Sequence, residues 1–89
     1  MKVLSFGAVW CPSCILMKLR WEKIQKELSW LQIEYYDYNQ DKEMIARYNI
    51  GRDIPLAIFL DQQNNELNRW QGEIDRQELI KFLGENKDK

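Results

Sequence analysis

Trp10-Cys11-Pro12-Ser13-Cys14 is the stretch of this 89-residue chain that decides its fold. Its two cysteines are the only ones in the sequence, and they stand where a short apolar run ends and a helical pattern begins. A thiol in the first turn of a helix meets unpaired backbone N–H groups and the positive end of the helix dipole, which favour the thiolate. The second thiol, one helical turn further on, can attack a disulfide that the first has formed. The motif therefore predicts two-electron thiol–disulfide exchange.

The segments on either side of this motif predict a strand and a helix. Residues 2–6 are short and apolar and are followed by Gly7, as expected of a buried strand. Pro12 suits the first turn of a helix, because its missing N–H needs no partner there. We expect this helix to run to about residue 28, with a stripe that faces the core made of Met17, Trp21, Ile24 and Leu28.

The rest of the chain predicts three more strands and two more helices. Aromatic and β-branched residues predict a strand over residues 31–38. Asp41 is the expected N-cap of a short helix that carries Met44, Ile45 and Tyr48 inward. A strand over residues 55–60, a turn at residues 62–65, an antiparallel strand over residues 66–71 and a final helix, opened by the capping box of Asp75 and Glu78, complete the chain.

The expected order is β-α-β-α-β-β-α, which defines an α/β fold. A strand, a crossover helix and a strand make a parallel unit, and the later hairpin adds antiparallel strands. The result is a three-layer α/β/α sandwich around a mixed four-stranded sheet. We place one domain over residues 1–84 and a polar tail over residues 85–89.

Composition limits the chemistry of this domain. The chain carries 13 basic and 14 acidic residues without a block of like charge, so nothing points to nucleic acid or to an anionic membrane. No run is long enough to cross a membrane. The absence of histidine removes Cys-His and Ser-His catalysis, and it removes the commonest nitrogen ligand for metals.

The number of cysteines and their position bear on the cellular compartment. Two cysteines are fewer than the roughly four to eight that staple a small secreted domain. The apolar start of the chain leads directly into the cysteine motif, so cleavage there as a signal peptide would destroy the site. We therefore expect a cytoplasmic protein, in which a cysteine pair is catalytic or binds a metal.

A Cys-x-x-Cys motif after the first strand of this element order resembles the active site of the thioredoxin family. The resemblance covers nearly the whole chain, because Ile54-Pro55 resembles the cis-proline loop of that family and Gly72 the glycine that lines its substrate groove. It implies a thioredoxin-like fold and a cis peptide bond before Pro55. One departure is Ser5, which stands where thioredoxins hold a buried aspartate, so water, Glu34 or another group would have to exchange a proton with the second thiol in its place. Another is that Trp70-Gln71-Gly72-Glu73 does not match the glutathione-binding segment of glutaredoxins.

The same resemblance implies roles for single residues. Cys11 would be the attacking thiolate and Cys14 the resolving thiol, and together they would form the redox-active disulfide. The residues that would bind the client are Trp10, Pro12, Ser13, Ile54, Pro55 and Gly72. The implied enzyme is a protein-disulfide oxidoreductase that acts on disulfide-containing client proteins and is recycled by a reductase or a small thiol. We expect a monomer that needs no cofactor and no metal.

Two other classes of function stay open. The domain could dock clients without turnover, or serve as the dedicated redox subunit of one enzyme, and nothing in the sequence excludes this. It could also carry a metal or an iron–sulfur cluster. Two cysteines cannot complete a four-ligand site, so that class requires a dimer or added glutathione.

Overall fold

A computed structural model describes residues 1–89 and confirms the predicted order of strands and helices. The elements are β1 (Lys2–Gly7), α1 (Pro12–Glu27), β2 (Gln32–Asp37), α2 (Lys42–Arg47), β3 (Leu56–Leu60), β4 (Glu66–Gln71) and α3 (Arg76–Glu85). Their boundaries lie within about two residues of those expected from hydrophobic periodicity, which is the usual precision of such patterns. No helix has both the length and the apolar character needed to span a bilayer.

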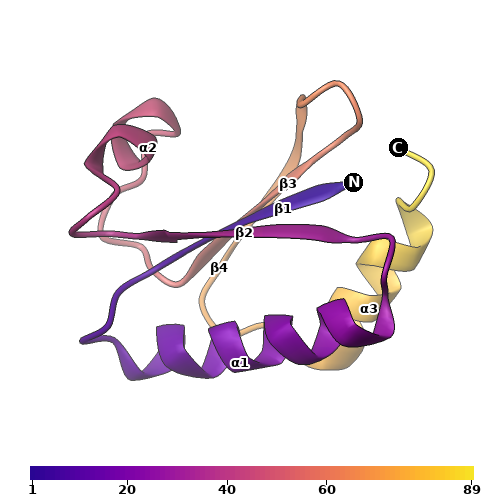
Figure 1. The fold of residues 1–89 in the computed structure, drawn as a ribbon, viewed down its shortest axis with the longest axis horizontal. Helices are drawn as coiled ribbons and strands as arrows, with labels where there is room; N and C mark the ends of the chain where they lie inside the picture. Colours follow the sequence, from indigo (N-terminus) through magenta and orange to yellow (C-terminus); the bar gives the residue numbers. More distant parts are fainter.

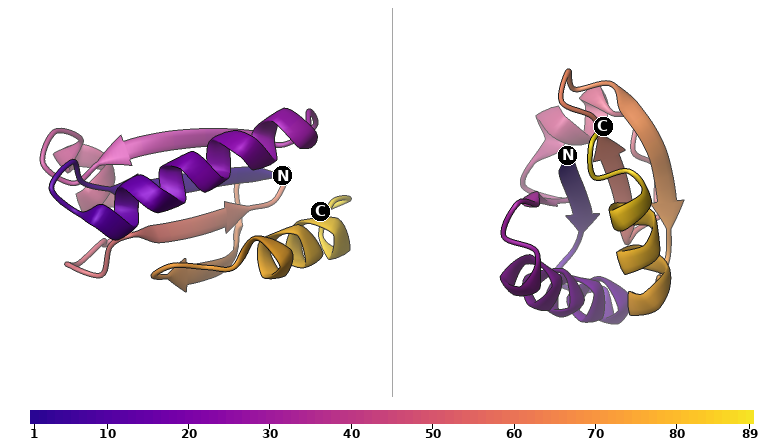
Figure 2. Two further views of the ribbon diagram at one scale, coloured as in Figure 1. Left: turned by 90° about the horizontal axis from the view of Figure 1, so that it is seen from below. Right: turned by 90° about the vertical axis from the view of Figure 1, so that its right-hand side faces the viewer.

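The four strands form one mixed sheet in the order β2-β1-β3-β4. β1 pairs in parallel with β2 across the α1 crossover, while β3 pairs antiparallel with both β1 and β4. Figure 1 shows α1 and α3 together on one face of the sheet and α2 on the other, and the two views of Figure 2 agree. The predicted three-layer α/β/α sandwich is therefore confirmed.

Alternation along β1 divides the core between the two faces of the sheet. Val3 points toward α1 and α3, whereas Leu4 and Phe6 point toward α2. The larger cluster, on the α1 and α3 face, consists of Val3, Met17, Trp21, Ile24, Leu31, Ile33, Ala57, Phe59, Ile74, Leu79 and Leu83. The smaller cluster consists of Leu4, Phe6, Ile50, Leu56, Ile58 and Leu60, with Met44, Ile45 and Tyr48 of the α2 region half-buried against it. Ser5 falls on the α1 face and is the only buried polar residue.

The predicted helix caps are wrong in their details. Asp41 and Asp75 stand at the N-cap positions of α2 and α3, but neither side chain caps its helix. The Asp41 carboxylate instead accepts a hydrogen bond from the backbone N–H of Asp37, at 2.7 Å. An aspartate before a helix can accept a hydrogen bond from another nearby donor. The capping box expected of Asp75 and Glu78 does not form either. At the other end of the chain, α3 extends to Glu85 and the carbonyl of Lys89 accepts a hydrogen bond from Gln62 N–H.

Candidate active site

Cys11 and Cys14 lie at the start of α1, just beyond the end of β1. Cys11 is the N-cap residue, with the extended backbone (φ −108°, ψ 109°) that this position favours, and Pro12 opens the first turn. The Cys14 backbone N–H donates a hydrogen bond to Cys11 Sγ at 3.3 Å. Both cysteines are free thiols, Cys11 partly exposed and Cys14 only 6% exposed. The first sulfur is thus open to attack a substrate, while the second lies behind it.

Burial sets the acidity of the inner thiol. Desolvation raises the pKa of Cys14 from 9.0 to about 12, a hydrogen bond to Cys11 acts in the same direction, and the Ala8 backbone opposes it. Because the folded protein binds this proton more tightly than the unfolded chain, the stabilisation is complete below pH 9.0 and is lost as the pH rises toward 12. We expect wild type to lose more stability than Cys14→Ala between about pH 8 and about pH 10.5 in urea unfolding. Equal losses in the two proteins would show that Cys14 ionises freely.

Gly7 lets the inner thiol pack against the backbone of β1. A Cβ on Gly7 would lie 2.9 Å from Cys14 Cβ, which is closer than real Cβ atoms come, and a tight 3.3 Å from Cys14 Sγ. We expect Gly7→Ala to destabilise the fold by about 1–3 kcal/mol, because either the strand or the first turn of α1 must shift. Gly84→Ala is the matched control, since nothing lies within 4 Å of a Cβ there. Chemical denaturation should show Gly84→Ala unchanged or stabilised, and equal behaviour of the two variants would contradict this role for Gly7.

The segments around Pro55 and Gly72 form the neighbouring wall of the site. The Ile54–Pro55 peptide bond is cis, as the resemblance implied, and Gly72 has the positive φ (87°) that favours glycine. Gly72 N–H donates a 2.7 Å hydrogen bond to the Pro55 carbonyl, so these two segments are joined. Ser13 Oγ in turn donates to the Glu73 carboxylate at 3.0 Å. The structure therefore brings Ser13, Pro55 and Gly72 together beside the cysteine pair.

Trp10 lies on the other side of the cysteine pair. Its indole N–H donates to the side-chain oxygen of Asn39 at 2.7 Å, and its ring meets Tyr38 edge-on at 6.3 Å between centroids. Asn39 and Tyr38 follow β2, at the opposite edge of the sheet from β4. Trp10 is 62% exposed. The predicted substrate-binding residues thus flank the cysteines on two sides, with Trp10 apart from Pro55 and Gly72.

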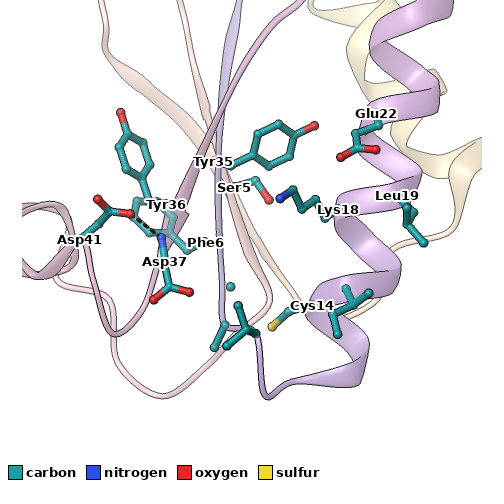
Figure 3. A pocket seen from close by; sticks show the side chains of 14 residues that line it. Ser5, Phe6, Cys14, Lys18, Leu19, Glu22, Tyr35, Tyr36, Asp37 and Asp41 are labelled. Carbon is teal, nitrogen blue, oxygen red and sulfur yellow. Dashed lines mark hydrogen bonds between the residues drawn. The ribbon is translucent and has the colours of Figure 1, made fainter.

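A pocket of about 470 Å³ opens between α1 and β2, and Cys14 lies at one end of it (Figure 3). Ser5, which stands where thioredoxins hold a buried aspartate, lines this pocket together with Tyr35, its partner on β2. Lys18 extends from α1 toward both, with its ammonium 5.6 Å from the centre of the Tyr35 ring. Burial, and then the charge of Glu22, raises the pKa of Tyr35, so the phenol stays neutral. No carboxylate replaces the missing aspartate beneath Cys14.

Glu34 is not that replacement either. It occupies β2 next to Tyr35, and because successive side chains of a strand alternate, it points to the α2 face of the sheet. There it accepts a hydrogen bond from the Tyr36 hydroxyl at 2.5 Å and lies 3.5 Å from the Lys2 ammonium. The sheet therefore separates this carboxylate from the cysteine pair.

Sequence reasoning missed the contacts that hold the site in place. Asn39, which fixes the Trp10 indole, and Gly7, which receives Cys14, carry no motif of their own. Glu73 was visible only as a charge beside Gly72, and its hydrogen bond to Ser13 spans 60 positions of the chain. One feature of the surroundings of Cys14 could be predicted. The alternation of side chains along β1 places Ser5 on the face of the sheet that α1 covers. No three His, Cys, Asp or Glu side chains are grouped so that they could hold a metal ion.

A cysteine pair at a helix N-terminus, beside a cis-proline loop on a sheet of this order, defines a thioredoxin-like protein. A family model described as thioredoxin matches residues 1–77, and the chain belongs to the thioredoxin family. A comparison with curated proteins finds no match.

Solved structures agree with this fold. Thioredoxin-2 of the malaria parasite, a component of its protein secretion machinery, superposes with a TM-score of 0.86 at 21% identity, over 94% of this chain and 81% of that one. Thioredoxin 1 of the thermophilic eubacterium Thermosipho africanus gives 0.83 at 24% identity, over 96% and 92%. The germline-specific thioredoxin Deadhead of Drosophila melanogaster gives 0.81 at 27% identity, over 94% and 78%.

Proposed function

We propose that this protein is a thiol–disulfide oxidoreductase that reduces disulfides of client proteins with Cys11 and Cys14. The observation that carries the proposal is the asymmetry of the pair at the start of α1. Cys11 is partly exposed and its Sγ accepts a hydrogen bond from the Cys14 backbone N–H, whereas Cys14, three residues further on, is buried. A sulfur that accepts a backbone N–H at a helix N-terminus, on a partly exposed residue, is placed to act as the attacking nucleophile.

The proposed reaction has two exchange steps. In the first, the Cys11 thiolate attacks one sulfur of the client disulfide, the client S–S bond breaks, and the departing client thiolate takes a proton from solvent. In the second, Cys14 loses its proton to solvent and attacks Cys11 Sγ, which releases the other client sulfur as a thiol. The client gains two electrons and two protons, and the enzyme is left with a Cys11–Cys14 disulfide.

The surroundings of Cys14 bear on the second step. Ser5 cannot act as a base near neutral pH, and the pocket beside Cys14 is open to solvent between α1 and β2. Water in this pocket is therefore the acceptor we propose for the Cys14 proton. The backbone N–H of Ile54 donates a hydrogen bond to the Arg52 carbonyl. The Ile54 carbonyl is therefore the group that could pair with an extended client segment.

The proposal extends to partners and compartment. The oxidised enzyme needs a reductase or a small thiol to supply two electrons in each cycle. A reducing cytoplasm provides such donors and keeps Cys11 and Cys14 available as thiols. We propose that the protein works there as a monomer, with client binding by Trp10, Pro12, Ser13, Ile54, Pro55 and Gly72.

The test is reduction of insulin by dithiothreitol, followed as precipitation of the released B chain. Wild type should accelerate precipitation at catalytic concentration. The same protein, alkylated at Cys11 with iodoacetamide and checked by mass spectrometry, should not. If the unmodified protein accelerates nothing but still binds clients, it is a docking module rather than an enzyme.

A further inference from the structure

The large apolar side chains that this protein exposes all come from one stretch of the chain. They are Val9, Trp10, Ile15, Leu16 and Leu19, with exposed fractions between 40% and 79%. All five belong to the loop before α1 or to its first two turns, and no strand, α2 or α3 contributes one. Single exposed apolar residues are ordinary, but a group of them on one surface marks an interaction site.

Three of these side chains, Val9, Ile15 and Leu19, line the pocket between α1 and β2, which we call the α1–β2 pocket. Ile15 and Leu19 are four residues apart and so share one side of the helix. The opposite wall is β2, an edge strand of the sheet, whereas Pro55 and Gly72 belong to the β3 and β4 side. The pocket therefore lies on the other flank of the cysteine pair from the Pro55 wall.

The charge of the α1–β2 pocket is negative. Glu22, Asp37 and Asp41 line it, and Lys18 is its only basic residue. None of the three carboxylates forms an ion pair. The salt bridges of the protein are those of Lys2 with Glu34, Arg69 with Glu66 and Arg76 with Glu27. Asp37 and Asp41 accept hydrogen bonds from the neutral N–H groups of residues 37, 39 and 40, which leaves their charges uncompensated. A positively charged partner complements this rim.

We propose that the α1–β2 pocket is a second docking site for the disulfide client, and that it takes an apolar side chain next to a Lys or Arg. The apolar side chain packs on Val9, Ile15 and Leu19, and the cation lies near Asp37 and Asp41. Because the pocket flanks Cys14 and leaves Cys11 open, the client can occupy it while its disulfide is attacked. This inference rests on the proposed function and names its substrate class.

The test compares two synthetic peptides, each closed by one disulfide, with Leu-Lys or Leu-Glu next to a cysteine. Wild type should reduce the Leu-Lys peptide about threefold to tenfold more efficiently, as kcat/KM, and the preference should shrink at high salt. Leu19→Gln should lower kcat/KM for the Leu-Lys peptide about tenfold through KM. Hydroxyethyl disulfide, too small to reach the pocket, should be reduced equally by both proteins.

Matched controls separate docking from general damage. Asp37→Asn removes a charge beside the proposed cation and should reduce the preference for Leu-Lys, whereas Glu78→Gln, on α3 and outside the pocket, should not. Leu16→Gln removes an exposed leucine that does not line the pocket and should leave the peptide KM unchanged. Equal rates for the two peptides, or a loss in Leu19→Gln that includes hydroxyethyl disulfide, would overturn the proposal.

Binding and association state complete the test. The Leu-Lys peptide with both cysteines replaced by serine should bind wild type more tightly than Leu19→Gln in calorimetry, whether or not the protein turns over. If wild type reduces hydroxyethyl disulfide but binds the Leu-Lys peptide no more tightly than Leu19→Gln does, the docking site is wrong and the proposed function still stands. A wild-type dimer that Leu19→Gln converts to a monomer would instead make the surface a contact between two copies.

Discussion

Replacing Cys11 by serine should lower the rate of insulin reduction by about 10³-fold or more, to the level of dithiothreitol alone. Cys11 is the partly exposed sulfur at the N-terminus of α1 and the one that receives the Cys14 backbone N–H. A serine hydroxyl in the same place does not ionise near neutral pH and cannot form a disulfide, so no step of the exchange remains. Substantial turnover by Cys11→Ser would mean that Cys14 reaches clients by itself.

Cys14→Ser tests the other half of the same reaction. This variant keeps the attacking sulfur but cannot resolve the mixed disulfide, so we expect it to accumulate covalent adducts with the client. Non-reducing electrophoresis and mass spectrometry should show an adduct that dithiothreitol releases. Cys14 is buried and its pKa is raised to about 12, so we expect it to react with the mixed disulfide rather than with clients directly. Adducts formed equally by wild type and Cys14→Ser would argue against a resolving role.

The largest effect on stability should come from Trp21→Ala, which we expect to lower the free energy of unfolding by about 3–5 kcal/mol. Trp21 is 1% exposed and packs against Phe59 at 6.1 Å between ring centroids, where α1 meets the sheet. Truncation leaves a cavity in the larger of the two clusters. A domain of this size has only a few kcal/mol to lose, so the variant should be largely unfolded at 37 °C or below.

Trp30→Ala is the matched control for this prediction. Trp30 lies in the turn before β2 and only partly covers the same cluster, with the Lys87 ammonium 5.4 Å from its ring. Because Trp30 is only half-buried at the edge of this cluster, its truncation leaves no enclosed cavity, so we expect a loss of about 1 kcal/mol or less. Urea unfolding, followed by circular dichroism, measures both. Similar losses in the two variants would contradict the position of Trp21 at the centre of the core.

The fold was predictable because apolar residues recur along the chain at the spacings that helices and strands require. The spacing of Met17, Trp21 and Ile24 predicted which side of α1 would be buried. Apolar or aromatic runs predicted β1, β2 and β3, and the turn at residues 62–65 predicted β4 as the next antiparallel strand. The caps at Asp41 and Asp75 were not predictable in the same way. A short acidic side chain bonds to whichever N–H the tertiary structure brings near, and for Asp41 that was the N–H of Asp37.

The candidate site was predictable as a list of residues but not as an arrangement. The spacing of Cys11 and Cys14 predicted the reactive pair, and the resemblance pointed to Pro55 and Gly72. The contacts that hold them in place join residues 29 and 60 positions apart, Trp10 to Asn39 and Ser13 to Glu73. One sequence does not reveal such pairs, because hydrogen bonds between distant side chains follow no repeating pattern along the chain. The negative charge of the α1–β2 pocket could not be predicted either, because Glu22, Asp37 and Asp41 come from different parts of the chain.

The inner sulfur is located by main chain, because Cys14 lies against a residue that has no side chain, Gly7. Backbone atoms in a paired strand cannot change rotamer, so this contact of Cys14 does not depend on the rotamers of the apolar interior. A redesign of the apolar core for heat tolerance should therefore leave Cys14 in its place against β1.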